Sequence, residues 1–304
     1  MNTSLRFFKG SCRAVEIMYN MPVLFLKEGL PLEFLGILIQ FIDTEWVMPV
    51  SYGIYHWVCI ALTVLACVLV CKYVKKPERD AMRRSFWVIF LVFVFLEAYK
   101  QICFTFDYDG ETISSEYLWY AFPFQFCSTP MYVSLLAAIS KNEKIHDAMC
   151  AYLVSFSLFA GLVVLAYPEQ CFVKTVGINI QTMVWHCGMI VLGVYLVASG
   201  YVKLDQKTVL KAIPVFICFV VCAVILNEVA YVTGLLEDHN FNMFFISPHC
   251  DPSLPVYSIV QELLPYPWCL LIYVAGFSAA AYLIVLITMG IKGVVGKKKA
   301  MMAV

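Results

Sequence analysis

The sequence predicts an all-α membrane protein, a polytopic bundle of seven transmembrane helices. The composition supports this prediction, because the 304-residue chain is 62% hydrophobic and only 14% charged, which is more apolar than a soluble domain. Seven apolar runs support it further, since each has about the 17–25 residues that a helix needs to cross a hydrocarbon core. The runs are roughly 55–74, 85–105, 117–140, 146–166, 180–202, 209–235 and 265–291.

The segments between the runs alternate in charge. Lys and Arg gather in 72–84, 141–144, 203–211 and the tail, whereas the intervening loops contain almost none (Lys174 alone). Under the positive-inside rule the basic segments are cytoplasmic. With an odd number of spans, the N-terminus then lies outside and the C-terminus in the cytoplasm, as expected of a multi-pass protein of the cell membrane.

The spans divide the chain into three parts. Residues 1–54 form an extracytoplasmic N-terminal region, 55–292 the seven-helix domain and 293–304 a basic cytoplasmic tail. Within the first part, 23–42 is apolar but interrupted by charged residues and by Pro31. Proline suits a first helical turn, and an apolar stripe follows it, which predicts an amphipathic helix on the outer membrane surface. An eighth span remains the alternative.

Polar residues inside the apolar runs are costly in lipid and usually face the bundle interior. Glu97 and Lys100 share one face of the second run, so we expect them to neutralise each other. At about 1.5 Å per residue, five polar side chains lie about 9–15 Å from the outer ends of their helices, which predicts an outward-opening cavity. These five are Glu97, Cys127, His186, Asn227 and Glu228.

The residues in this cavity indicate one kind of chemistry. Cys127 and His186 are the candidate nucleophile and base, because a thiolate forms when a partner takes the thiol proton. Gln125, Asn227 and Glu228 are candidates to orient the imidazole or to donate to an oxyanion. The alternative for His186 is a hydrogen-bonded structural residue, and for Cys127 a small hydrophobe.

Other site classes find little support. Cys171 and Cys250 fall in predicted outer loops, where a disulfide between them is an open alternative. The five histidines show no paired ligand spacing, so we predict no metal or other cofactor. Net charge zero gives no indication of nucleic acid.

Several segments resemble one family. Phe122–Cys127 resembles the Leu-Pro-Leu-His-Leu-Cys motif of the YwaF-like bacterial integral membrane proteins, distant relatives of the eukaryotic transmembrane protein 164 family. Four further segments, in the same order over about residues 50–290, are similar to other elements of that family. They are Ala160–Pro168, Trp185–Gly188, Asn227 with Asn240–Phe245, and Pro265–Trp268.

The resemblance implies seven helices and, for the eukaryotic branch, acyl transfer on membrane lipids through a cysteine with a histidine partner. Those roles would fall on Cys127 and His186, and the resemblance also brings Asn242 and Trp268 into the predicted pocket. One departure concerns Gln125, which stands where the bacterial motif has His and cannot act as a base.

Two functions remain open from the sequence. The first is a lipid acyltransferase or lipid-ester hydrolase with a membrane lipid as its partner. The second is a non-enzymatic membrane protein, a receptor or transporter, that binds a lipid or small molecule. In that protein Glu97, Lys100, His186 and Glu228 would line the binding pocket.

Overall fold

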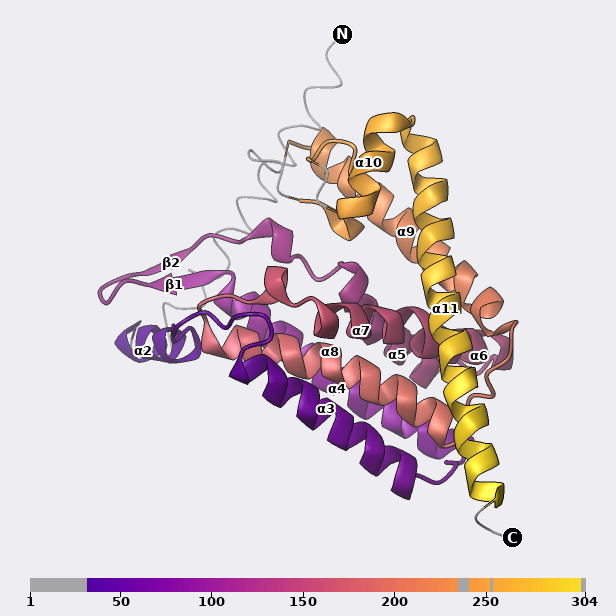
Figure 1. The fold of residues 1–304 in the computed structure, drawn as a ribbon. Helices are drawn as coiled ribbons and strands as arrows, with labels where there is room; N and C mark the ends of the chain where they lie inside the picture. Colours follow the sequence, from indigo (N-terminus) through magenta and orange to yellow (C-terminus); the bar gives the residue numbers. More distant parts are fainter. Residues whose placement is uncertain (1–31, 235–240, 252–253, 302–304) are drawn as a thin grey trace.

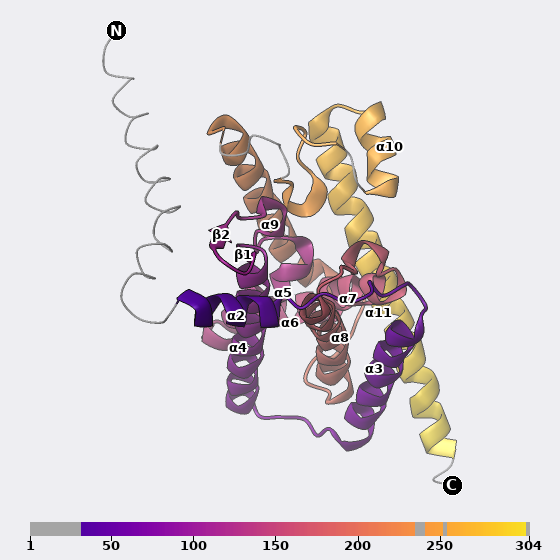
Figure 2. The same cartoon turned by 90° about the vertical axis from the view of Figure 1, so that its left-hand side faces the viewer.

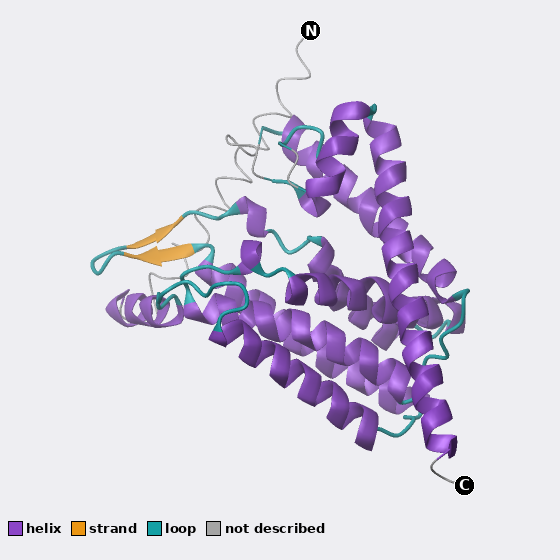
Figure 3. Cartoon of the chain, viewed as in Figure 1, coloured by secondary structure: helices purple, strands orange, loops and turns teal. Residues whose placement is uncertain are grey.

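The computed structural model describes residues 32–234, 241–251 and 254–301. This part of the chain is helical almost throughout, with one small pair of strands (Figure 3). Six of its helices are long and apolar enough to cross a membrane. The all-α prediction is therefore confirmed, whereas the prediction of seven spanning helices is not, since the described residues contain six such helices.

Three of the long helices lie side by side, with α8 between the other two (Figures 1 and 2). They are α3 (Ile54–Tyr73), α4 (Arg79–Cys103) and α8 (Val176–Ala198). No proline interrupts any of them, so each predicted run forms one continuous helix. Large apolar side chains on α3 and α4, such as Leu62 and Phe95, are exposed. Exposure of this kind suits contact with lipid.

The third run, 117–140, is not one continuous helix. It follows a hairpin of β1 (Phe106–Tyr108) and β2 (Ile113–Ser115), paired antiparallel with Phe106 opposite Ser115. Pro123 holds the preceding residue in an extended conformation, which prevents a helix there. Two 3₁₀ turns, η1 (Trp119–Ala121) and η2 (Phe126–Ser128), lead into the short helix α5 (Thr129–Ile139).

The helical part of this run is too short to cross a bilayer by itself. Phe126–Ile139 rises about 21 Å, against a hydrocarbon core of about 30 Å. Pro130 fits the first turn of α5, where its missing N–H has no helical partner. The third run is thus an extended segment followed by a short helix, and a seventh spanning helix is not confirmed.

The most buried long helix contains a local change of winding. It consists of α6 (Glu143–Tyr152), a π-helical turn η3 (Leu153–Ser157) and α7 (Leu158–Ala166). The Asn142 side chain caps its start by accepting from the backbone N–H groups of Lys144 and Ile145. The η3 turn contacts α5, α8, α9 and α11, so it lies at the centre of the bundle.

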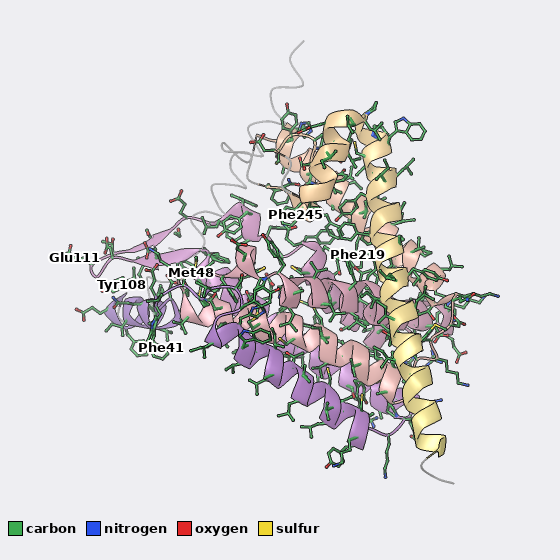
Figure 4. The ribbon with its side chains drawn as sticks, in the orientation of Figure 1. Phe41, Met48, Tyr108, Glu111, Phe219 and Phe245 are labelled. Atoms are coloured by element: carbon green, nitrogen blue, oxygen red, sulfur yellow. The ribbon has the colours of Figure 1, made fainter. Side chains whose placement is uncertain are left out.

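The C-terminal part adds α9 (Thr208–Val232), α10 (Pro255–Leu263) and α11 (Tyr266–Met301), which runs along one edge of the molecule in Figure 1. Between α9 and α10 the chain makes the short turn η5 (Met243–Phe245). Phe219 of α9, labelled near the middle of Figure 4, packs against Phe124, Tyr132 and Tyr152. Aromatic contacts of this kind join α9 to the rest of the core.

The helix α2 (Leu32–Ile42) falls within the stretch 23–42, and the part of that stretch before residue 32 lies outside the described residues. Its place on the outer membrane surface stays a prediction. The α2 helix packs beside the hairpin, where a Cβ at Gly36 would overlap the Tyr108 ring. Tyr99 of α4 donates to the Ile42 carbonyl at 2.6 Å. An apolar groove of about 480 Å³ lies between α2, α4 and the hairpin.

Basic segments from different parts of the chain meet at one end of the bundle. Arg79 pairs with Glu143 at 2.7 Å, Arg83 donates to the Ser140 carbonyl, and Lys292 donates to the Val197 carbonyl at 3.1 Å. At the other end, the Thr175 hydroxyl donates to the Asp43 carboxylate at 2.9 Å.

Candidate functional site

The ion pair expected on α4 forms and is buried. Lys100 Nζ lies 2.7 Å from Glu97 Oε1, with side-chain exposures of 17% and 8%. Gln101 donates to the same carboxylate oxygen at 2.7 Å and to the Ala121 carbonyl at 2.9 Å. Tyr117 donates in turn to the Gln101 side-chain oxygen at 2.6 Å. The charged pair is therefore held in place by the segment that leads toward Cys127.

Cys127 lies in the η2 turn at the start of α5 and is partly exposed. The indole Nε1 of Trp185 donates to its carbonyl at 2.8 Å. The thiol is close enough to Lys100 and Glu97 to interact electrostatically with both charges. The Trp185 ring also packs on Phe93 of α4, with centroids 4.4 Å apart. Three elements, α4, η2 and α8, thus meet around the thiol.

His186 follows Trp185 on α8 and is buried. Its Nδ1 lies 2.8 Å from the Thr182 carbonyl oxygen. A carbonyl oxygen can only accept, so Nδ1 carries the proton and Nε2 of the neutral ring keeps a lone pair. Lys100 lies within electrostatic range of this ring as well. In the described part of the chain no direct hydrogen bond joins the imidazole to the Cys127 thiol.

Gln125 and Asn227 have partners other than the imidazole. The Gln125 amide donates to the Asn242 carbonyl at 3.1 Å and accepts from the Phe244 N–H at 3.0 Å. The Asn227 amide makes the same two kinds of bond with the backbone of Met243, at 3.1 and 2.8 Å. Both side chains therefore hold the segment after α9 rather than orient His186.

Asn242 belongs to that same segment. Its side-chain oxygen accepts from the Ser247 N–H at 2.9 Å. The bond closes the backbone on itself, so Asn242 shapes the turn instead of facing a ligand.

Two predicted residues lie apart from this cluster. Glu228 pairs with His249 at 3.1 Å, and the His249 ring stacks on Tyr231 with centroids 3.5 Å apart. The side chain of Trp268, at the start of α11, is 60% exposed. The structure thus places Lys100, paired with Glu97, within electrostatic range of both Cys127 and His186. Glu228 and Trp268 have other surroundings.

No disulfide joins Cys171 to Cys250 in the structure. Cys171 lies in the turn η4 (Glu169–Cys171). Burial and then the nearby Cys127 raise the pKa of its thiol to about 12. Cys171 is therefore a protonated neighbour of the site at neutral pH.

Sequence reasoning missed two further parts of the site. Trp185 is directly beside His186, so its position was visible although its bond to Cys127 was not. Tyr152 is fully buried, shares a 2.7 Å hydrogen bond with Thr129 and lies within electrostatic range of Cys127. Tyr152 directly precedes the π-helical turn, for which the sequence carries no signal. Among the described residues no group of three or more His, Cys, Asp or Glu side chains is placed to hold a metal ion.

Comparison with known proteins gives one match. The sequence model of the TMEM164 family matches residues 51–288, which include every helix from α3 to α10 and most of α11. None of the curated proteins or solved structures compared with the chain matches it.

Proposed function

Because this chain belongs to the TMEM164 family, we propose that it is a membrane-embedded enzyme that transfers or hydrolyses the acyl group of a lipid ester. Cys127 is the nucleophile and His186 the base. The observation that supports this most is the hydrogen bond from Trp185 to the Cys127 carbonyl, because it ties the helix of His186 to the segment that carries the thiol. The unprotonated Nε2 of His186 suits a base.

The proposed reaction has two steps, acylation of Cys127 and transfer of the acyl group to an acceptor. In the first, His186 Nε2 takes the thiol proton while Cys127 Sγ attacks the ester carbonyl. The carbon–oxygen bond to the leaving alcohol then breaks, and that alcohol receives the proton from His186. In the second, a hydroxyl acceptor or water gives its proton to His186 Nε2 and attacks the thioester carbonyl. The carbon–sulfur bond then breaks, and His186 returns the proton to Cys127 Sγ. The Lys100 ammonium supplies a positive charge near the thiolate of the first step.

We also propose the sidedness and the compartment. The C-terminus and the basic ends lie in the cytoplasm and the N-terminus lies outside, in a cell-membrane protein. The clustering of Arg79, Arg83 and Lys292 at one end of the bundle supports this orientation. The seventh crossing is made by the extended segment and α5 together. The Phe122–Cys127 motif favours the YwaF-like bacterial branch, and the partner is a membrane lipid.

The direct test labels purified protein with a chloroacetamide probe and quantifies each cysteine peptide by mass spectrometry. We expect Cys127 to react faster than the exposed Cys71, and the His186→Ala variant to lose most of that difference. Hydrolysis of a fluorescent lipid ester in nanodiscs should fall about 10²–10⁴-fold in His186→Ala. Turnover that persists in Cys127→Ala would contradict the proposal.

A non-enzymatic lipid-binding protein is the second candidate. It is favoured by the missing direct bond between thiol and imidazole in the described residues and by the buried ion pair beside them. This function predicts no turnover in wild type, and a co-purifying lipid that is lost in Lys100→Met. Retention of the same lipid by that variant would argue against it.

A further inference from the structure

The segment that follows α9 contains an unusual backbone. Phe244 and Phe245 both have positive φ, 60° and 57°. Residues with a Cβ seldom occupy this region, and they stay in it only where the surrounding structure holds them. The turn is therefore a strained element that other parts of the fold keep in place.

The restraints on this turn come from three separate elements. Gln125 holds its backbone through two hydrogen bonds, and Asn227 of α9 holds it through two more. Tyr273 of α11 donates to the Phe244 carbonyl at 3.1 Å. The polar backbone groups of Met243 and Phe244 are thus fully paired within a buried site.

Side-chain packing points the same way. The Phe244 ring is fully buried. It contacts Phe124 and Phe126, with centroids 6.0 and 5.9 Å apart. These two residues flank Gln125, and Phe126 directly precedes Cys127. The turn therefore grips the segment before the thiol both through its backbone and through an aromatic ring.

We propose that the turn Asn242–Ile246 is a clamp that positions the Cys127 thiol, with Gln125 and Asn227 as its positioning residues. The proposal rests on the proposed function, because it assumes that Cys127 must be aimed toward His186. Trp185 holds the thiol segment from the α8 side, and the clamp holds it from the side of α9 and α11. Together they fix the segment between two otherwise separate parts of the bundle.

The first test asks whether the clamp couples Cys127 to His186. Chloroacetamide labelling of Cys127 is measured in wild type, Gln125→Met and Asn227→Leu, each with and without His186→Ala. We expect either clamp variant to slow labelling about 10-fold or more, since small misplacements of reacting groups are costly. Adding His186→Ala to either clamp variant should then change the labelling rate little, because the alignment of the thiol with the imidazole is already lost.

Three further variants sharpen this test. Gln125→Glu keeps an acceptor for the Phe244 N–H, so its labelling rate should lie between wild type and Gln125→Met. Thr233→Val, the matched control on α9, removes a side-chain hydrogen bond outside the clamp and should label at the wild-type rate. Gln125→Met and Asn227→Leu each remove two hydrogen bonds. If one of them does not fold, Tyr273→Phe, which removes a single hydrogen bond, should still slow labelling about two- to five-fold. The clamp is overturned if Cys127 is labelled at the wild-type rate in folded Gln125→Met or in Tyr273→Phe, and if His186→Ala slows labelling in that variant as much as in wild type.

Hydrogen exchange separates failure of the clamp from failure of the enzyme. In Asn227→Leu the peptides covering 241–247 and 123–130 should lose protection together, whether or not the protein turns over a lipid. If wild-type labelling does not depend on His186, the proposed function fails while this coupling remains measurable. Protection of 123–130 that survives the opening of 241–247 overturns the clamp by itself.

Discussion

Two pairs of charged or titratable side chains in this bundle, Glu97 with Lys100 and Glu228 with His249, differ in burial and in their hydrogen bonds. Glu97 and Lys100 are buried on α4 with additional hydrogen bonds. Glu228 and His249 are a looser pair, with side-chain exposures of 42% and 25%. A buried charge that loses its partner is expensive, whereas an exposed pair contributes little. Burial therefore decides which pair the fold depends on.

Adjacent residues of one helix belong to different regions of this molecule. Asn227 and Glu228 are neighbours in the sequence, about 100° apart around the axis of α9. Asn227 faces inward and holds the turn after α9, while Glu228 pairs with His249. Depth along a helix thus places a residue in a layer, and rotation about the axis selects its partners.

The largest expected effect comes from breaking the buried pair. Glu97→Ala leaves the Lys100 ammonium unpaired and should lower the free energy of unfolding by about 3–5 kcal/mol. Glu228→Ala, the matched change in the exposed pair, should lower it by less than about 1 kcal/mol. Unfolding in mixed SDS micelles measures both, and equal effects would refute the contrast.

A smaller effect is expected at Trp185. Trp185→Phe keeps a ring against Phe93 but removes the donor to the Cys127 carbonyl. We expect a stability loss of about 1 kcal/mol and slower chloroacetamide labelling of Cys127. Unchanged labelling in a variant that has lost this stability would show that the bond serves the fold alone.

Trp268 should matter less again. Its exposed side chain lies apart from the buried cluster, so Trp268→Ala should leave Cys127 labelling at the wild-type rate. If Trp268→Ala lowers the labelling rate of Cys127 as much as Trp185→Phe does, Trp268 belongs to the site and the contrast between the two regions is weaker.

The smallest effect belongs to Asp109, in the exposed turn of the hairpin. The N–H groups of Thr112 and Glu111, together with the Thr112 hydroxyl, hold the pKa of this carboxyl below its usual range. Its folded-state pKa is depressed, so its contribution is present above the unfolded pKa of about 3.9 and is lost as pH falls through the folded value. The protection factors of the hairpin amides, which remove the intrinsic pH dependence of exchange, should be higher at pH 6 than at pH 2.5 in wild type. In Asp109→Asn the part of this pH difference that comes from the Asp109 carboxylate should be absent.

Much of the fold was predictable because most of the apolar runs form long helices, and α9 does so even with Pro214 inside it. The bounds of α3, α8 and α9 lie within about four residues of the predicted runs. The third run differs because Pro123 and Pro130 outweigh its hydrophobicity, and both residues are visible in the sequence. The π-helical turn within the fourth run was not predictable, because its winding is set by packing around it.

The site was predictable in part for a similar reason. Period and spacing placed Glu97 beside Lys100 and gave a common depth for Cys127 and His186. They could not reveal that Gln125 and Asn227 bind backbone groups, since those partners lie 117 and 16 residues away along the chain. Long-range backbone contacts of this kind exist only after the helices have packed.

The π-helical turn Leu153–Ser157 has a consequence for how this protein can change. An ordinary α-helix turns by about 100° per residue. A π-helical turn winds less tightly, because its hydrogen bonds run from residue i to residue i+5, so it takes up one additional residue while the helix beyond it keeps its face. On either side of this turn, α6 packs against α9 and α7 packs against α8. Deleting one residue within Leu153–Ser157 should therefore restore ordinary winding and leave α7 against α8. The same deletion within α7 would rotate the residues beyond it by about 100° and separate them from their partners. The π-helical turn is thus the place where this helix can best change in length.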